Sequence, residues 1–429
     1  MRTCSGQVGD CTLTIDIRRL ARALIIFGIA ITPILSIGEL AALLSGAFDS
    51  QVTVYTPFYL KAVKDLLSIL LILLGIVHLL RSGKTNQLII PFFVLFLYTV
   101  VVALSGSDSP ALALAGIRWI MPVFVAFFIY EFVDGVLLSR LATLLGYMLI
   151  GQLVLQVGEL YFMSHWYGAI IFGLAARVPG FFVIPITAGF FALVALLFAH
   201  FYSTRPLLKR IVYLVAPVSI LLTQSGTGLV VYALIVVMLV LGVKRIWLAL
   251  PLAIVLAFIM VPLLPMLTGR SADYVTVSGG TRIDIFLDLL QSSRWLPTAF
   301  GYVTNTAVSL VANGTISAGA VPTIVDSTYS SVLGNLGITG AIFFSLFIFS
   351  WAVVVVCARR LDLYVATALF AVYGLTMIVF EAYPINLLLA VLAAYFFRES
   401  YIPFWTAHNR HSQPPYRVRA HFENPTRDV

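Results

Sequence analysis

Charged residues are scarce in this chain: only 10% of its 429 residues are Asp, Glu, Lys or Arg, whereas 61% are hydrophobic. A soluble domain carries about 25% charged and about 45–50% apolar residues, so the composition excludes a soluble enzyme and a disordered chain. Its three cysteines, Cys4, Cys11 and Cys357, form no disulfide framework. The six histidines are scattered away from metal-ligand spacing, and no phosphate-binding glycine loop is present. We therefore expect no metal, no cofactor and no nucleic-acid partner.

What the chain has instead is blocks of about 20 apolar residues, the length that a helix needs to cross the hydrocarbon core of a bilayer. The predicted spans are 22–44, 63–80, 88–105, 111–133, 141–161, 179–200, 210–223, 228–242, 246–267, 332–357, 363–380 and 384–398. The sequence thus predicts an all-α, polytopic integral membrane protein with about twelve transmembrane helices. Because the seventh and eighth spans are separated only by Gln224–Thr227 and the last span is short, about eleven or thirteen spans remain alternatives.

The positively charged residues indicate the orientation. With the N-terminus inside, most of the 26 Lys and Arg residues fall in cytoplasmic segments, as the positive-inside rule requires. Both termini are then cytoplasmic. The predicted organisation is a cytoplasmic segment 1–21, transmembrane helices 1–9 over 22–267, one large outer loop 268–330, transmembrane helices 10–12 over 331–400 and a flexible cytoplasmic tail 401–429. Long loops that persist usually carry function, so we expect the chemistry at the outer loop.

One arginine is predicted inside a membrane span. If the fourth span begins near Pro110, Arg118 lies about 12 Å below its outer end. A cation at that depth is unfavourable unless it faces a cavity or a counter-ion, which makes Arg118 a candidate functional residue. The alternative is a long side chain that snorkels outward to the interface.

Two further arginines lie in outer loops. Arg177 directly precedes the Val-Pro-Gly turn at the mouth of the sixth span, which is expected to hold it at the membrane surface. Arg282 follows Thr281, and Thr281 and Asp284 have the spacing of a capping box. This spacing predicts a helix that starts here, with Arg282 beside the free N–H groups of its N-terminus, a natural anion site. A salt bridge or a lipid headgroup contact would explain either arginine alone.

The predicted helix after Arg282 has one apolar face, made by Ile283, Phe286, Leu287 and Leu290. Such a helix either lies on the bilayer or packs over the spans. Guanidinium groups bind phosphate bidentately and keep their charge at any physiological pH. Several of them on one face suit a pyrophosphate carried on a lipid. Among the acids of the loop, Asp326 is the candidate to accept a proton from an attacking sugar hydroxyl.

Three short patches resemble the bacterial Wzy-type polysaccharide polymerases and the related O-antigen ligases. They are Arg177-x-x-Gly180-x-Phe182-x-x-Pro185, then Arg282 with Phe286, Pro297 and Gly301-Tyr302, and finally Asp326-Ser327-Thr328-Tyr329 with Leu333, Gly337 and Gly340. Their order and predicted sidedness match that family over residues 60–400 in layout, although only these patches match in sequence. A narrower likeness is to the exopolysaccharide polymerases of the xanthan-gum type.

The resemblance implies an inverting, metal-independent glycosyltransferase with a GT-C-like multispan fold in the bacterial inner membrane. It would move a growing glycan from undecaprenyl pyrophosphate to a lipid-linked repeat unit at the periplasmic face. Arg177 and Arg282 would bind the pyrophosphate, Asp326 would position or deprotonate the acceptor, and Arg118 would support the outer cavity. Tyr302 and Tyr329 could offer sugar-stacking surface, although aromatic packing is the favoured role for both. A flippase and a chain-length co-polymerase of the same pathway are the expected protein partners.

The sequence also departs from the family pattern. Ile186 stands where the family often has asparagine, and Ser225-Gly226 where it often has Ser-Arg. Ligases carry a histidine where this chain has Asp326, which favours a polymerase over a ligase. The ligase remains one alternative. A flippase or other transporter of lipid-linked oligosaccharide remains a second, disfavoured because most predicted span interiors lack charge.

Overall fold

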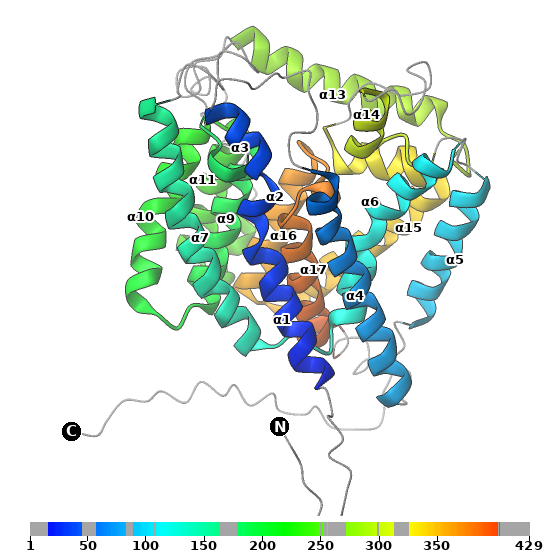
Figure 1. The fold of residues 1–429 in the computed structure, drawn as a ribbon, viewed down its shortest axis with the longest axis horizontal. Coiled ribbons are helices and arrows are strands. Elements are labelled where there is room, and N and C mark those ends of the chain that lie inside the picture. Colours follow the sequence, from blue (N-terminus) through cyan, green and yellow to red (C-terminus); the bar gives the residue numbers. More distant parts are fainter. Residues whose placement is uncertain are drawn as a thin grey trace, which may run out of the picture.

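In a computed structural model of the protein, the described residues are 16–44, 57–82, 89–105, 109–162, 178–182, 184–248, 251–252, 255, 272–297, 300–312, 326–401 and 403. Within these residues the structure is helical and has no strand. Figure 1 shows upright helices packed side by side, with two helices lying across one end of the bundle. The all-α fold class predicted from the hydropathy is therefore confirmed.

The helices extend over these ranges: α1 (Ile17–Ala30), α2 (Thr32–Leu35), α3 (Ile37–Leu44), α4 (Phe58–Ser82), α5 (Ile89–Ser105), α6 (Pro110–Ile129), α7 (Gly135–Phe162), α9 (Pro185–Tyr202), α10 (Pro206–Thr223), α11 (Gly226–Leu241), α13 (Ala272–Ser292), α14 (Asn305–Ala312), α15 (Thr328–Ala358), α16 (Leu361–Gly374) and α17 (Ile385–Phe396). Short 3-10 turns are η1 (Gly180–Phe182), η2 (Val243–Leu248) and η4 (Val379–Glu381), and a π-helical turn, η5 (Phe397–Tyr401), follows α17.

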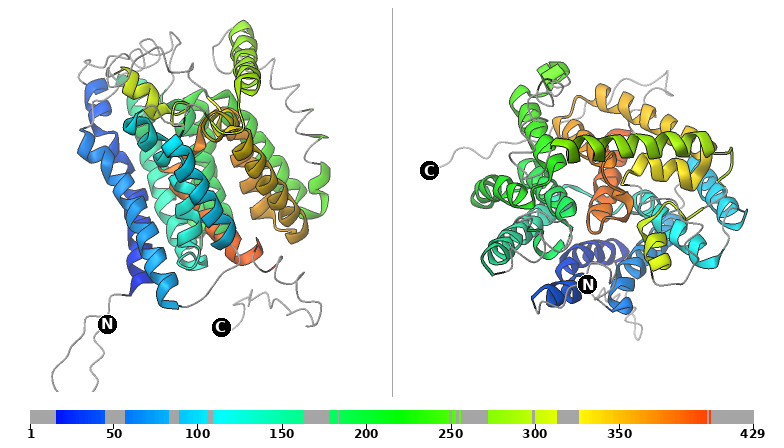
Figure 2. Two further views of the ribbon diagram at one scale, coloured as in Figure 1. Left: turned by 90° about the vertical axis from the view of Figure 1, so that its right-hand side faces the viewer. Right: turned by 90° about the horizontal axis from the view of Figure 1, so that it is seen from above.

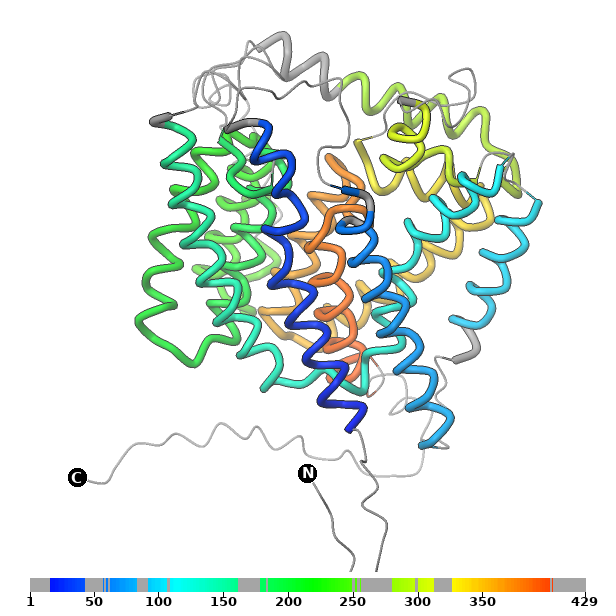
Figure 3. The backbone as a smooth tube through the Cα atoms, viewed as in Figure 1, coloured from blue at the N-terminus to red at the C-terminus, as the bar shows by residue number. Residues whose placement is uncertain are grey.

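Seven helices in the described residues are long and apolar enough to cross a membrane, and three shorter apolar helices accompany them. The chain is thus a multi-pass membrane protein. Most of the predicted ninth span, 246–267, lies outside the described residues, so the total of about twelve spans stays a prediction. Successive helices run in opposite directions through the bundle, as the backbone trace of Figure 3 shows for α4 to α7 and for α15 to α17.

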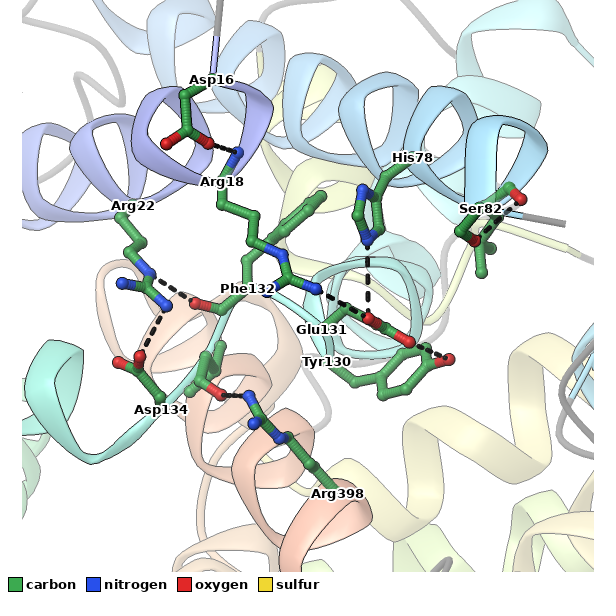
Figure 4. Close-up of polar contacts among 12 residues, drawn as sticks. Asp16, Arg18, Arg22, His78, Ser82, Tyr130, Glu131, Phe132, Asp134 and Arg398 are labelled. Carbon is green, nitrogen blue, oxygen red and sulfur yellow. Dashed lines mark hydrogen bonds and ion pairs between the residues drawn. The ribbon is translucent and has the colours of Figure 1, made fainter. Parts of the chain in front are cut away.

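The bundle has two different ends. At one end, which we call the terminal face, α1 begins and α17 ends. Figure 4 shows how this face is held together: Arg22 contacts Asp134 at 2.6 Å, and Arg398 donates to the carbonyl of Val133 at 3.1 Å. In the same cluster, Arg18 pairs with Glu131 at 3.3 Å. The opposite end, where α13 and α14 lie, is called the loop face.

Most basic residues of the described chain gather at the terminal face. They are Arg18, Arg19, Arg22, Arg81, Arg140, Arg205, Lys209, Arg210, Lys244, Arg245, Arg359, Arg360 and Arg398. The loop face has a different balance, with several acidic side chains near its few arginines. This asymmetry is the charge pattern that the positive-inside rule associates with a cytoplasmic terminal face.

The most deeply buried of the candidate membrane-spanning helices is α9, whose side chains are almost all buried. It packs against α7, α10, α11 and α16. Phe190 of α9 stacks on Tyr373 of α16 with 4.0 Å between ring centroids. A helix that is apolar all round is expected to be buried in this way.

Two predicted helix boundaries illustrate what local sequence can and cannot fix. The fourth span begins at Pro110 as expected, because the Ser109 hydroxyl accepts the N–H of Leu112 and caps the helix. The predicted eleventh span, 363–380, is present as α16, but its predicted end is wrong: α16 ends at Gly374, and an irregular segment with η4 follows. Thr328 explains the difference, because its hydroxyl bonds the carbonyl of Met377 at 2.7 Å and the N–H of Val379 at 2.9 Å. These tertiary bonds replace the helical ones.

Candidate functional site

The structure brings together two of the predicted site residues on the loop face. Nη2 of Arg282, in α13, lies 3.6 Å from Oδ2 of Asp326. Asp326 directly precedes Ser327, the N-cap of α15. The Arg282 and Asp326 side chains are 32% and 56% exposed, so solvent and ligands can reach the pair.

The predicted helix start at Thr281 is wrong. α13 already begins at Ala272, so Arg282 lies within the helix and not at its N-terminus. The glycines before Thr281 do not end the helix, because a helical glycine costs only about 1 kcal/mol relative to alanine. The N–H groups next to Arg282 are therefore part of the helical ladder. The guanidinium charge remains a candidate phosphate ligand, but the helix N-terminus does not contribute.

Arg118 has a specific counter-ion. Its Nε lies 3.0 Å from Oδ1 of Asp65, a residue of the apolar helix α4. About a third of each side chain is exposed, at 34% and 33%. The positive charge of Arg118 also acts on Glu381. Of the environments weighed for Arg118, the structure thus shows a counter-ion, and Asp65, the acid of the predicted second span, was the signal available in the sequence.

Glu381 holds the start of α14. Its carboxylate accepts the N–H of Asn305 at 2.6 Å, the N–H of Thr306 at 3.3 Å and the Thr306 hydroxyl at 3.0 Å. A carboxylate at this position satisfies N–H groups that a helix N-terminus leaves without partners. Burial raises the pKa of the Glu381 carboxyl, while these hydrogen bonds and Arg118 act in the opposite direction. Sequence analysis missed Glu381, which lies in the short connection between the predicted spans 363–380 and 384–398.

Asp326 and Glu381 belong to chain segments that hydrogen bonds join to each other. Thr328 is two residues after Asp326 and bonds Met377 and Val379, and Glu381 is two residues after Val379. The Ser327 hydroxyl adds a bond to the carbonyl of Gly374 at 3.3 Å. We call Asp65, Arg118, Arg282, Asp326 and Glu381 the loop-face polar cluster. It combines two guanidinium groups with three carboxylates at one end of the bundle.

Part of the predicted outer loop 268–330 is buried in the helix bundle. Residues 300–304 enter the bundle between α6 and α15, and Phe300 is fully buried. Asn335 fixes this re-entrant segment: its Oδ1 accepts the N–H groups of Gly301 at 3.0 Å and Val303 at 3.3 Å. Gly301 has φ +88°, and a Cβ here would collide with the carbonyl oxygen of Leu112. Only glycine therefore fits at this position.

The two tyrosines considered for sugar stacking occupy different environments. Tyr302 is only 4% exposed in the re-entrant segment, so its ring is part of the packing and not a free stacking surface. Tyr329 is half-buried, and its hydroxyl donates to the carbonyl of Ala371 at 3.1 Å. Its ring makes an edge contact with Phe344. The burial of Tyr302 agrees with the packing role favoured for it and leaves its ring no exposed face for stacking, because this part of the loop enters the bundle.

Arg177 lies outside the described residues, but the segment after it is firmly held. Three polar residues on one face of α7 bind its backbone. Gln152 donates to the carbonyl of Pro179 at 2.6 Å, and Gln156 donates to that of Val178 at 2.9 Å. Glu159 accepts the N–H of Gly180 at 2.9 Å. Gly180 has φ +62°, which supports the predicted Pro-Gly turn. The i, i+4, i+7 spacing in the fifth span was a signal that sequence analysis did not use.

No protein-family model, curated protein or solved structure matches the chain. Among the side chains that the structure describes, no group of three His, Cys, Asp or Glu residues could hold a metal ion. The charged side chains paired at the loop face in the described residues are guanidinium and carboxylate groups.

Proposed function

We propose that the protein is a polysaccharide polymerase that transfers a growing glycan from undecaprenyl pyrophosphate to a lipid-linked repeat unit. The reaction would take place at the loop face, with the basic terminal face in the cytoplasm of a bacterium and the loop face toward the periplasm. The observation that supports this proposal most directly is the exposed pair of Arg282 and Asp326 within the loop-face polar cluster. A phosphate ligand and a carboxylate base are the two groups that the reaction needs.

In the proposed reaction, the pyrophosphate of the donor replaces Asp326 as the partner of Arg282. This exchange costs little free energy, because the pair is 3.6 Å apart and solvent-accessible. Such exposed ion pairs contribute only about 0–1 kcal/mol to stability. Phosphate also matches the guanidinium fork better than a single carboxylate oxygen at that distance. The exchange would free the Asp326 carboxylate next to the bound donor.

The transfer step then balances as follows. The hydroxyl oxygen of the acceptor sugar forms a bond to the anomeric carbon of the donor glycan, and its proton moves to Asp326. The bond between the anomeric carbon and the pyrophosphate oxygen breaks, and the electron pair stays on the pyrophosphate. Arg282 stabilises the negative charge that develops there, which is where electrostatic catalysis is most effective. Arg177, by its place in the sequence before the clamped Val178–Phe182 segment, is proposed as a second phosphate ligand.

The test is reconstitution in lipid vesicles with a defined lipid-linked repeat unit as the substrate. Arg282→Lys should abolish elongation or reduce it by about tenfold or more, because an ammonium group cannot reproduce the two-point contact. Asp326→Asn should lower the rate of transfer while the donor still binds. Arg294→Lys is the matched control, since Arg294 lies in the same loop with an exposed side chain. Normal chain lengths in both Arg282→Lys and Asp326→Asn would refute the assignment.

A transporter of lipid-linked oligosaccharide is the second candidate. The ion pair of Asp65 and Arg118 favours it, because both residues project from membrane-spanning helices, and ionisable pairs at such positions often belong to transport pathways. The same vesicles separate the functions. Elongated lipid-linked product indicates the polymerase, one transfer to a different acceptor indicates a ligase, and translocation without a new glycosidic bond indicates the transporter.

A further inference from the structure

The second half of α13 presents an apolar surface that nothing in the described chain covers. Four residues form this surface, which we call the apolar stripe: Ile283, Phe286, Leu287 and Leu290, with exposures of 62%, 36%, 45% and 48%. At 100° per residue they fall within a sector of about 100° on the helix. Four large apolar side chains exposed on one sector are unfavourable in water, because removing apolar surface from water lowers the free energy.

The other two sides of the helix have different characters. Ile285 and Leu289 are less exposed, and their side of α13 faces α15, the helix that α13 contacts most. Asp284, Asp288 and Gln291 are exposed on the remaining side. The helix therefore has one side against the protein, one apolar side and one acidic side. This division is typical of a helix at the boundary between hydrocarbon and water.

The position of α13 places the apolar stripe next to the membrane-spanning surface. Figures 1 and 2 show that α13 crosses the loop face and reaches the periphery near α5 and α15. Just beyond its end, Trp295 is 68% and Leu296 is 47% exposed. Their backbone is attached to α15, because Thr339 donates its N–H to the carbonyl of Trp295 at 3.2 Å. Exposed tryptophan is common at membrane interfaces.

The exposed apolar belt of α15 begins directly below this attachment. Ile342 and Phe343 are 46% and 47% exposed, and Ile342 lies about 4.5 Å along the helix from Thr339. Exposed apolar side chains therefore occur on α13, at Trp295 and Leu296 just beyond its end, and on α15 just past the attachment of Trp295. Because α15 is long and apolar enough to cross a membrane, the neighbourhood of its exposed side chains favours lipid as the occupant of the stripe.

We propose that the apolar stripe of α13, with Trp295 and Leu296, inserts into the bilayer leaflet at the loop face. The partner is the phospholipid surface itself, at the boundary between headgroups and acyl chains. This insertion fixes the depth of Arg282, which lies on α13 beside Ile283. A guanidinium held at the depth of the lipid phosphates is positioned for a phosphate carried on a lipid anchor.

The experiment measures depth with spin labels in phospholipid nanodiscs. Single cysteines are introduced as Leu287→Cys and Leu290→Cys, with Asp284→Cys and Asp288→Cys as matched controls on the same helix, in a chain whose native cysteines are replaced by serine. Labels at the two leucine positions should collide severalfold more often with oxygen, which dissolves in lipid, than with a water-soluble nickel complex. The two aspartate positions should show the reverse preference.

Two results would overturn the proposal. Equal nickel access at all four positions would place the apolar stripe in water. Protection of the stripe from both reagents would show that a protein surface covers it. Ile283→Cys gives a third position on the stripe in case one of the leucine variants fails to fold. The measurement needs no substrate, so its outcome is independent of the proposed transferase activity.

Discussion

Asn335 is the residue on which the insertion of the re-entrant segment depends most, and replacing it tests that arrangement directly. The side chain is fully buried in α15. Its Oδ1 accepts two N–H groups, those of Gly301 and Val303, and its Nδ2 donates to the carbonyl of Val303 at 2.9 Å and to Ser331 at 3.1 Å. Asn335→Leu keeps the approximate volume of the side chain and removes all four bonds.

The expected loss follows from the groups that remain without partners. The carbonyl of Val303 still accepts the Ser331 hydroxyl at 2.6 Å, so two buried N–H groups are orphaned, those of Gly301 and Val303. Each orphaned buried group costs about 1–3 kcal/mol, which gives about 2–6 kcal/mol for the variant. Ser331→Ala is the matched control, since Asn335 still bonds Val303 in that variant, and we expect a loss of about 1 kcal/mol.

Local opening is measured by thiol labelling. Val303→Cys, introduced into a chain without other cysteines, places a thiol at a position that is 4% exposed. A loss of 2 kcal/mol should raise the labelling rate by about 30-fold if labelling follows the opening equilibrium. The Ser331→Ala control should raise it by less than about tenfold. If Asn335→Leu labels no faster than Ser331→Ala, the hydrogen-bonded anchor described here is incorrect.

Three further predictions concern the other polar contacts. Gly180→Ala should lower thermal stability by about 1–3 kcal/mol, because φ is +62° and the new Cβ would lie 2.5 Å from Oε1 of Gln152; Gly151→Ala, with nothing within 4 Å, should be neutral or stabilising. Arg118→Leu should cost about 1–3 kcal/mol, less than a fully buried pair because a third of each side chain is exposed, and adding Asp65→Asn should recover part of the loss in a double-mutant cycle; additive losses would contradict the pairing. Burial raises the pKa of Glu381, so its contribution to stability is full below the ordinary glutamate pKa and is lost as the pH rises through the raised value. The parent should therefore lose stability relative to Glu381→Gln as the pH increases over that window, and parallel thermal unfolding curves would argue against it.

The helix ends show most clearly how much structure the local sequence predicts. The start of the fourth span near Pro110 agrees with α6, because the Ser109 cap and the proline act through neighbouring backbone atoms. Thr281 and Asp284 have the same kind of local signal, yet α13 passes through them. A capping box stabilises a helix start only where the preceding residues are not themselves helical. The capping-box pattern does not show whether the residues before it are themselves helical.

In the candidate site, too, some features were predicted from the sequence and others depend on tertiary contacts. Arg282 and Asp326 were chosen on the basis of sequence, and the structure places them 3.6 Å apart. Glu381 lies in the short connection between two predicted spans, and nothing local indicates that its carboxylate binds the start of α14, far away in the chain. The polarity of the outer loop also gives no sign that residues 300–304 enter the bundle and bury Tyr302.

By itself, the sequence determined that this is a multi-pass helical membrane protein and at which end its positive charge gathers. Both follow from the transfer of each residue between water and lipid, a property that sums along the chain and needs no knowledge of neighbours. Only the tertiary structure decided which charges meet, which helices break and which part of the outer loop is buried. Those outcomes depend on hydrogen bonds and ion pairs between residues far apart in the chain, such as Asp65 with Arg118 and Gly301 with Asn335.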